Sequence, residues 1–224
     1  MQKKWSEYQL ILFDMDGTLY FQRPLQIHMG IKMLISCLNP GGFQELMIVL
    51  RFRKLRENWK NSANTPTPSS NIDEAQYRLL AMQTGLSSEE ITQIIQKWIY
   101  RLPLQILMRY RDNQLTEILK KYHLHTQVAI YSDYPASEKC NALDLKHIPC
   151  FYGGQREISC LKPDPKGIQV IMNYYHITDP STVLMIGDRF SKDGQAAIAA
   201  GTDYLILKKH RFQRNKQYEL LLSE

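Results

Sequence analysis

Residues Leu10–Tyr20 read LILFDMDGTLY, an apolar run that ends in two carboxylates, Asp14 and Asp16, followed at once by Gly17. A short apolar run bounded by polar residues is typical of a buried strand in a parallel sheet. We therefore predict a strand over Tyr8–Phe13. An Asp-Gly pair is also ordinary turn chemistry, so the rest of the chain must decide whether the two carboxylates do more than turn the backbone.

The second half of the chain alternates between strand and helix patterns. A helix is expected behind an Asp112 N-cap, and others near Pro135, after Asp164-Pro165, over GQAAIAA and in the C-terminal tail. Strands are expected at Gln127–Tyr131, Val183–Gly187 and Tyr204–Leu207. This alternation predicts an α/β fold, a Rossmann-like parallel sheet with helices on both faces.

The segment after the first strand shows helix patterns and no convincing strand pattern. Its three predicted apolar stripes are Ile48, Phe52, Leu55 and Trp59; Ala75, Leu79, Met82 and Leu86; and Ile91, Ile94, Ile95, Trp98, Ile99 and Leu102. Ser87 and Glu90 have the spacing of a capping box that opens the third, and Asn61–Asn71 has loop composition. We predict an α/β core over 1–21 and 112–224, interrupted by an α-helical cap over 22–111.

Composition and charge favour a globular cytoplasmic protein. The chain has 224 residues, 44% of them hydrophobic, and a net charge of +6. The basic residues are spread along the chain and no RNA-reading aromatic motif accompanies them, so nucleic acid is not expected as a partner. No apolar run is long enough to span a bilayer, no signal peptide is evident, and the four cysteines lack ligand or disulfide spacing. The positive charge favours an anionic substrate.

Polar residues recur where the predicted strands end. Ser132 and Asp133 follow the second strand, Lys162 precedes the Asp164-Pro165 helix start, and Asp188 with Asp193 follows the strand VLMIG. Each has an ordinary explanation alone, as a cap or a solvated loop residue. Because ligands bind at the carboxyl ends of parallel strands, we expect these side chains to meet Asp14 and Asp16 at one edge.

The motifs DMDGTLY, YSD, LKPDP and MIGDRFSKDGQAAIAAG, in this order, resemble those of the haloacid dehalogenase-like hydrolase superfamily. The helical insert after the first motif is similar to the cap of its phosphoglycolate-phosphatase-like and β-phosphoglucomutase-like members. The chain departs from the common pattern in YSDYP, where asparagine often follows the serine, and in GDR, where GDS is frequent. The departure at Asp133 changes the charge beside the site and bears on substrate preference.

This resemblance implies residue roles and a cofactor. Asp14 would be the nucleophile that forms an aspartyl phosphate, and Asp16 would be the general acid and base. Mg²⁺ would bind Asp14, the Asp16 backbone carbonyl and Asp188, with Asp193 binding it directly or through water. The phosphoryl group would be held by Ser132, backbone amides near Asp133, and Lys162, which also neutralises Asp14.

The sequence thus predicts a Mg²⁺-dependent phosphatase acting on a small phosphorylated metabolite. An acid at Asp16 favours this activity, because dehalogenase-type members of the superfamily lack an acid at that position. A phosphomutase and a catalytically silent binding protein stay open as alternatives. The substrate and the oligomeric state are not readable: the Trp59 and Trp98 stripes fit either a cap–cap contact or a core. The basic helix with Arg51, Lys54 and Arg56 is interpreted as a solvated face rather than as a substrate-steering one.

Overall fold

The computed structural model describes residues 4–59 and 71–222, and the chain divides into two compact units. One consists of Met1–Gln22 with Arg111–Glu224, and the other of Arg23–Tyr110. The loop predicted over Asn61–Asn71 lies, except for Asn71, outside the described residues.

The first unit contains a five-stranded sheet whose paired strands are all parallel. Its strands are β1 (Leu10–Phe13), β2 (Gln127–Ser132), β3 (Cys150–Tyr152), β4 (Val183–Gly187) and β5 (Asp203–Ile206), in the order β3-β2-β1-β4-β5. β1 is fully buried, because it lies between β2 and β4 with Leu10 opposite Gln127 and Val183. The predicted α/β fold is confirmed, with strand ends that differ by one or two residues.

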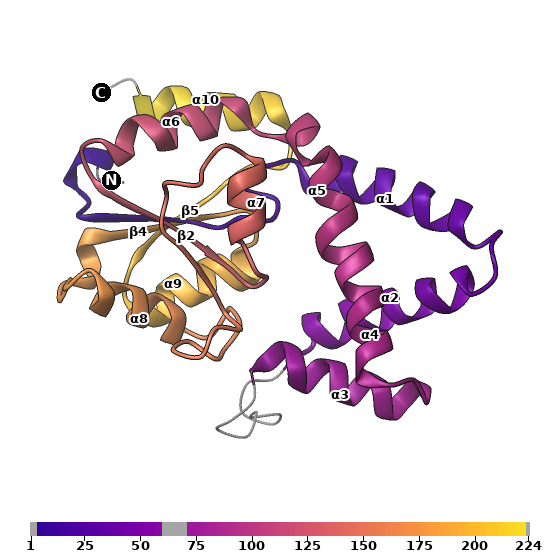
Figure 1. The fold of residues 1–224 in the computed structure, drawn as a ribbon. Helices are drawn as coiled ribbons and strands as arrows, with labels where there is room; N and C mark the ends of the chain where they lie inside the picture. Colours follow the sequence, from indigo (N-terminus) through magenta and orange to yellow (C-terminus); the bar gives the residue numbers. More distant parts are fainter. Residues whose placement is uncertain (1–3, 60–70, 223–224) are drawn as a thin grey trace. The chain divides into compact units, whose positions relative to one another are not determined.

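Helices cover both faces of this sheet (Figure 1). α6 (Asn113–His123) and α10 (Arg211–Leu222) lie on one face, and α8 (Lys166–Tyr174) and α9 (Gln195–Ala200) lie on the other. The short α7 (Ser137–Ala142) follows β2. Asp112 caps α6 as predicted, its carboxylate accepting a hydrogen bond from the Leu115 amide at 3.2 Å. The predicted helix start with Pro165 at the first helical position is one residue too early. α8 begins at Lys166, and Pro165 is its N-cap.

The second unit is helical throughout its regular structure within the described residues. It comprises α1 (Gln22–Ser36, whose first residue belongs to the sheet unit), α2 (Gly42–Glu57), α3 (Ile72–Thr84), α4 (Ser88–Ile95) and α5 (Leu102–Leu107), with a π-helical turn, η2 (Gln96–Arg101), between the last two. The capping box at the start of α4 is present, since Ser87 and Glu90 exchange side-chain and backbone hydrogen bonds. Trp98 is buried in this unit and donates from Nε1 to Glu45 at 2.6 Å.

The stripe predicted for α3 is wrong. Met82 is 83% exposed, and the buried residues of the helix are Ile72, Tyr77 and Leu80 together with Asp73 and Gln76. Arg56 of α2 accounts for the two polar residues, because it is only 3% exposed, pairs with Asp73 and donates to Gln76 Oε1 at 2.8 Å. A buried arginine needs such partners. The solvated-face interpretation therefore fails for Arg56, while Arg51 and Lys54 are exposed as predicted.

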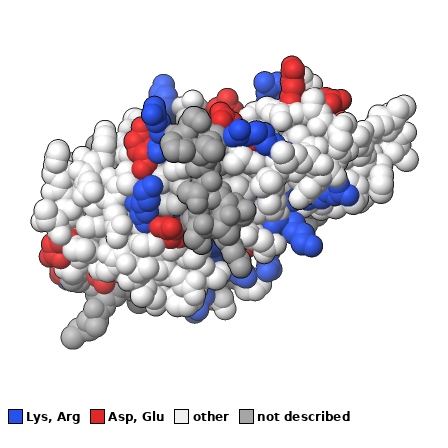
Figure 2. Space-filling model, turned by 90° about the horizontal axis from the view of Figure 1, so that it is seen from below, with Lys and Arg blue, Asp and Glu red and all other residues white. Residues whose placement is uncertain are grey.

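The face drawn in Figure 2 shows no long basic stripe among the described residues. On the face seen in Figure 2, Lys and Arg side chains are scattered and interspersed with Asp and Glu. Among the described residues, no helix combines the length and apolarity that crossing a bilayer requires.

Candidate active site at the ends of β1 and β4

The sheet topology creates a natural site between β1 and β4. The chain moves from β1 to β2 on one side and returns to β4 on the other, so the connections diverge at the ends of the two central strands. Such a switch point leaves a crevice at the carboxyl edge of a parallel sheet. Asp14 follows β1 and Asp188 follows β4, so both stand at this edge.

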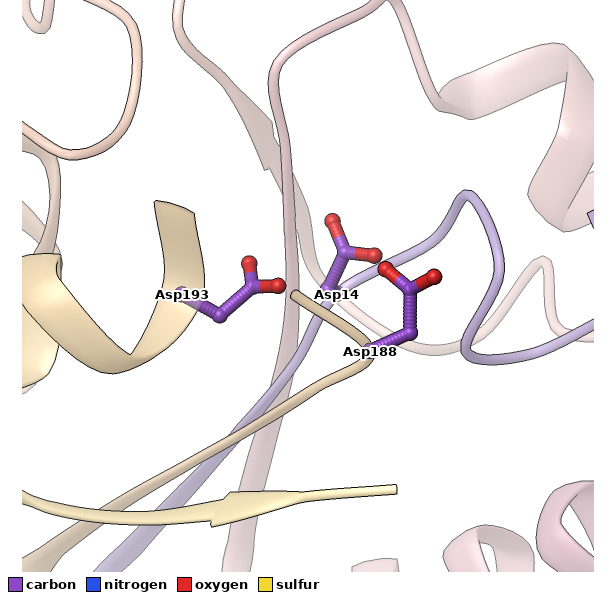
Figure 3. A group of neighbouring side chains, drawn as sticks. All are labelled: Asp14, Asp188 and Asp193. Atoms are coloured by element: carbon purple, nitrogen blue, oxygen red, sulfur yellow. The ribbon is translucent and has the colours of Figure 1, made fainter. Parts of the chain in front are cut away.

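Three carboxylates converge here, from Asp14, Asp188 and Asp193, which we call the carboxylate cluster. One oxygen of each lies within 4.8 Å of the others, and Figure 3 shows their carboxyl groups gathered at the strand ends. Asp193 comes from a short π-helical turn, η5 (Phe190–Gly194), that follows β4. Asp14 and Asp193 are buried, at 6% and 2% exposure.

Lys162 is the cation inside this cluster. Its Nζ donates to Asp14 Oδ1 and to Asp193 Oδ1, both at 2.6 Å, and its side chain is 2% exposed. The Asp133 carboxylate accepts from the Lys162 amide at 2.9 Å and thereby fixes the backbone of this lysine. A lysine amine buried among carboxylates is held as a fixed positive charge rather than as a solvated side chain.

One lysine does not balance three acids. Burial raises the pKa of Asp14 well above its usual range; Lys162 lowers it, and the neighbouring carboxylates raise it further. Burial, with repulsion from Asp193, raises the pKa of Asp188 to about 6. Crowded, desolvated carboxylate oxygens of this kind are the ligands that a hard divalent cation prefers, so the donor set fits Mg²⁺.

The loop after β1 depends on Gly17. This residue has φ of +91°, and a Cβ built on it would lie 2.4 Å from Asp188 Oδ2. Only glycine tolerates both the left-handed backbone and this close approach. Arg214 of α10 holds the same loop by donating to the carbonyls of Gly17 at 2.8 Å and Thr18 at 3.1 Å.

Asp16 lies close to the carboxylate cluster but has different partners. Its carboxylate accepts hydrogen bonds from Lys139 Nζ of α7 and from Tyr20 Oη. Burial alone would raise the pKa of Asp16, but the charge and hydrogen bond of Lys139, with the bond from Tyr20, bring it below the ordinary value. Two neighbouring acids thus have opposite shifts: the pKa of Asp14 is raised and that of Asp16 is lowered.

Ser132 ends β2 and is fully buried, with its Oγ accepting a hydrogen bond from the Tyr134 amide at 3.1 Å. The predicted role of Ser132 and Asp133 in holding a phosphoryl group stays a prediction. The structure brings Asp14, Asp188, Asp193 and Lys162 together, and it adds Lys139 and Arg214, which sequence reasoning missed. No sequence motif marks Lys139 or Arg214, because each lies in a helix far along the chain from the loop after β1 that it contacts.

Comparison with known proteins places this arrangement among related folds. A family model described as haloacid dehalogenase-like hydrolase matches residues 8–201. No curated protein matches the chain.

Solved structures share the fold at low sequence identity. A 2-haloacid dehalogenase from Pseudomonas syringae pv. Tomato DC3000 is 16% identical with a TM-score of 0.59, over 89% of this chain and 86% of that one. The HAD-hydrolase candidate YfnB from Bacillus subtilis, bound to magnesium, is 13% identical with a TM-score of 0.61, over 98% and 99%. A predicted phosphoglycolate phosphatase from Haemophilus somnus 129PT is 18% identical with a TM-score of 0.57, over 91% and 86%.

Proposed function

Because the chain belongs to the haloacid dehalogenase-like hydrolase family, we propose that it is a Mg²⁺-dependent phosphatase acting on a small phosphorylated metabolite. The observation that carries this proposal is the pair of unlike acids, Asp14 and Asp16. Asp14 lies within the carboxylate cluster beside Lys162, whereas Asp16 is held outside it by Lys139 and Tyr20. Phosphate ester hydrolysis needs a nucleophile and a separate proton carrier, because its leaving group is an alkoxide.

The metal would be held by Asp14, Asp188 and Asp193, with the Asp16 backbone carbonyl as a further oxygen ligand. When bound, Mg²⁺ supplies positive charge that offsets the repulsion between the anionic substrate and the carboxylates. Lys162 supplies a second positive charge from the protein itself, with its Nζ at 2.6 Å from Asp14 Oδ1. In this proposal, Ser132 and the amide near Asp133 bind the phosphoryl oxygens.

The first chemical step uses Asp14 as the nucleophile. A bond forms between an Asp14 carboxylate oxygen and phosphorus while the bond from phosphorus to the ester oxygen breaks. Asp16 gives its proton to the departing ester oxygen, so an alcohol leaves. In the second step Asp16 takes a proton from a water molecule that attacks phosphorus. The bond from phosphorus to the Asp14 oxygen breaks, which frees the Asp14 carboxylate and releases inorganic phosphate.

The surroundings of Asp16 imply how it acquires its proton. With Lys139 as its partner, Asp16 is ionised at neutral pH. To serve as an acid it must be protonated when the substrate binds, and a phosphate monoanion carries a proton into the site. The added negative charge of a bound phosphate also raises the pKa of a neighbouring carboxyl group. The proposal includes a cap role for the helical unit, whose residues would select the metabolite.

The test is hydrolysis of an aryl phosphate with and without Mg²⁺, comparing the native chain with Asp14→Asn. Turnover should require the metal and fall by about 10³-fold or more in the variant, because the nucleophile is lost. Asp144→Asn, which changes an exposed aspartate paired with Lys120, is the matched control and should keep full activity.

A panel of metabolite phosphates and 2-haloacids then separates the related activities. Metal-independent halide release with no phosphate release would overturn the proposal in favour of a dehalogenase. Isomerisation of a hexose phosphate without net phosphate release would point to a mutase. No turnover on any substrate, with no Mg²⁺-dependent binding of beryllium fluoride at Asp14, would leave a binding protein on this fold.

A further inference from the structure

One face of the helical unit is apolar and exposed. Eight large apolar side chains of α1, α2 and the turn between them are exposed by 36% or more. They form what we call the α1–α2 apolar face: Ile27, Ile31, Leu34, Ile35, Leu38, Phe43, Met47 and Leu50. Leu38 is 86% exposed, and Ile27 and Phe43 are each 66% exposed. Single exposed apolar residues are normal on a surface, but Ile27, Ile31, Leu34 and Leu38 recur at helical spacing on one side of α1 and the turn after it. An exposed apolar group of this kind marks an interaction site.

The spacing on α1 is that of a helix–helix contact. Pro24, Ile27, Ile31, Leu34 and Leu38 follow one another at intervals of three and four residues. This is the heptad pattern of a seam that packs against another helix. The other side of α1 is already used, since Leu25, Met29 and Met33 are buried within the protein. α1 thus has two apolar sides, of which the described structure covers one.

The size of the face fits a subunit interface. Side chains with these exposed fractions present on the order of 100 Å² each. Together the eight present about 800 Å², which is the area that one partner contributes to a standard stable interface. Phe43, Met47 and Leu50 form a second exposed apolar row, on α2, which follows α1 after a short turn (Figure 1).

We propose that the α1–α2 apolar face binds a second copy of this chain, with the two α1 helices antiparallel across a two-fold axis near Ile31. Ile31 is the midpoint of the seam from Pro24 to Leu38, so an antiparallel pairing brings Ile31 onto its own copy and Ile27 onto the Leu34 region. Such a self-complementary patch is what a two-fold dimer requires. A Cβ built on the neighbouring Gly30 meets no atom within 4 Å, so another helix can approach closely there.

Charge supports this orientation. α1 contains no acidic residue, and its exposed cation, Arg23, lies in the first turn. In an antiparallel pair Arg23 faces the C-terminal end of the opposite α1, where the helix dipole is negative. A parallel pair would bring the two Arg23 side chains together. α1 carries only the cations Arg23 and Lys32, fewer than interfacial membrane helices usually have. α2 adds exposed Arg51, Arg53 and Lys54, so a membrane surface is the alternative occupant that the experiments must exclude.

The first test is sedimentation velocity of the full chain over a range of concentrations. The native chain should form a dimer, and Ile31→Arg should weaken dimerisation by at least about 100-fold, because two unpaired charges would be buried at the axis. Met82→Arg, at an apolar site of α3 that is 83% exposed, is the matched control and should dimerise like the native chain. Circular dichroism verifies that both variants are folded. A native monomer at every concentration, or a dimer that Ile31→Arg leaves intact, would overturn the proposal.

Cysteine cross-linking tests the orientation. In a Cys37→Ser background, Ile31→Cys should form a disulfide-linked dimer under mild oxidation, whereas Leu38→Cys should not, since the antiparallel ends lie far apart. Cross-linking at both positions would show a parallel pair, and cross-linking at neither would place the contact elsewhere; either result refutes the proposed dimer. A monomer that floats with vesicles of anionic lipid would refute it in favour of a membrane surface.

Discussion

The ion pair between Lys139 and Asp16 gives the most informative perturbation of this protein. Both side chains are largely buried, at 10% and 13% exposure. Lys139→Met keeps most of the side-chain length while removing the charge. It leaves the Tyr20 hydrogen bond and the charge of Lys162 as the influences that still lower the pKa of Asp16. Breaking one side of a buried pair costs about 3–5 kcal/mol. We expect about 3 kcal/mol at pH 7.5, because the Tyr20 hydrogen bond and the residual exposure soften the loss.

The pH dependence has a definite sign. In the native protein the pKa of Asp16 lies below its unfolded value, so the ionised carboxylate contributes stability above that value and loses it as pH falls. In Lys139→Met, burial is the largest influence left, and the pKa of Asp16 should rise above the unfolded value. Stability then falls as pH rises through this range. The difference between the two proteins should therefore be smaller at pH 4.5 than at pH 7.5.

Urea unfolding of four proteins measures the pair itself: native, Lys139→Met, Asp16→Asn and the double variant. Asp16→Asn leaves Lys139 as a buried unpaired cation, so adding Lys139→Met to it should be neutral or stabilising. Lys97→Met is the matched control, because Lys97 pairs with Glu45 at 2.8 Å but is 48% exposed, and it should cost at most about 1 kcal/mol. Equal costs of Lys139→Met in both Asp16 backgrounds would refute the reasoning.

Two further perturbations test the carboxylate cluster. Burial raises the pKa of Asp188 to about 6 in the folded metal-free protein, so the stability contribution of this group is lost as pH rises through that value. Asp188→Asn should therefore stabilise the metal-free protein at pH 7.5, by at most about 3 kcal/mol. The same variant should reduce the stabilisation by Mg²⁺, as thermal unfolding with and without EDTA will show. Gly17→Ala should destabilise the protein by about 1–3 kcal/mol, because the backbone is left-handed and the added methyl group meets Asp188, and isothermal titration should detect weakened Mg²⁺ binding; unchanged binding would argue against Asp188 as a ligand.

The parts of the site that could be predicted from sequence are those that strand order alone brings together. Asp14 and Asp188 directly follow two neighbouring parallel strands, so finding the strands was enough to place both acids at one edge. Lys162 and Asp193 were found through motifs with fixed spacing to those strands. β3 was missed because it has only three residues, all of them partly buried, too few for a periodic pattern.

Residues that are buried because of a partner elsewhere in the chain could not be identified from strand ends or motifs. Lys139 is 123 positions from Asp16 in the chain, and a lysine in a short helix after β2 resembles any solvated lysine. Arg56 misled for the same reason: a charged residue in a basic stretch is usually exposed, and its burial depends on Asp73 and Gln76, which follow in the next helix. Single-residue preferences describe a side chain without its partners, and these cations are buried because of their partners.

The apolar side chains of α1 show that residue type can also mispredict exposure, because several apolar residues of this helix are exposed. A run rich in Ile, Leu and Met predicts burial, and in α1 that is true of Leu25, Met29 and Met33 but not of Ile31 or Leu34. The apolar pattern indicates that one side of the helix packs against another surface. The pattern is the same whether that surface belongs to this chain or to a second copy. The fold supplies the missing information, because it shows which side the chain has already used. An apolar heptad seam that stays exposed in the folded chain is therefore stronger evidence for an interface than an apolar run in the sequence alone is for a core.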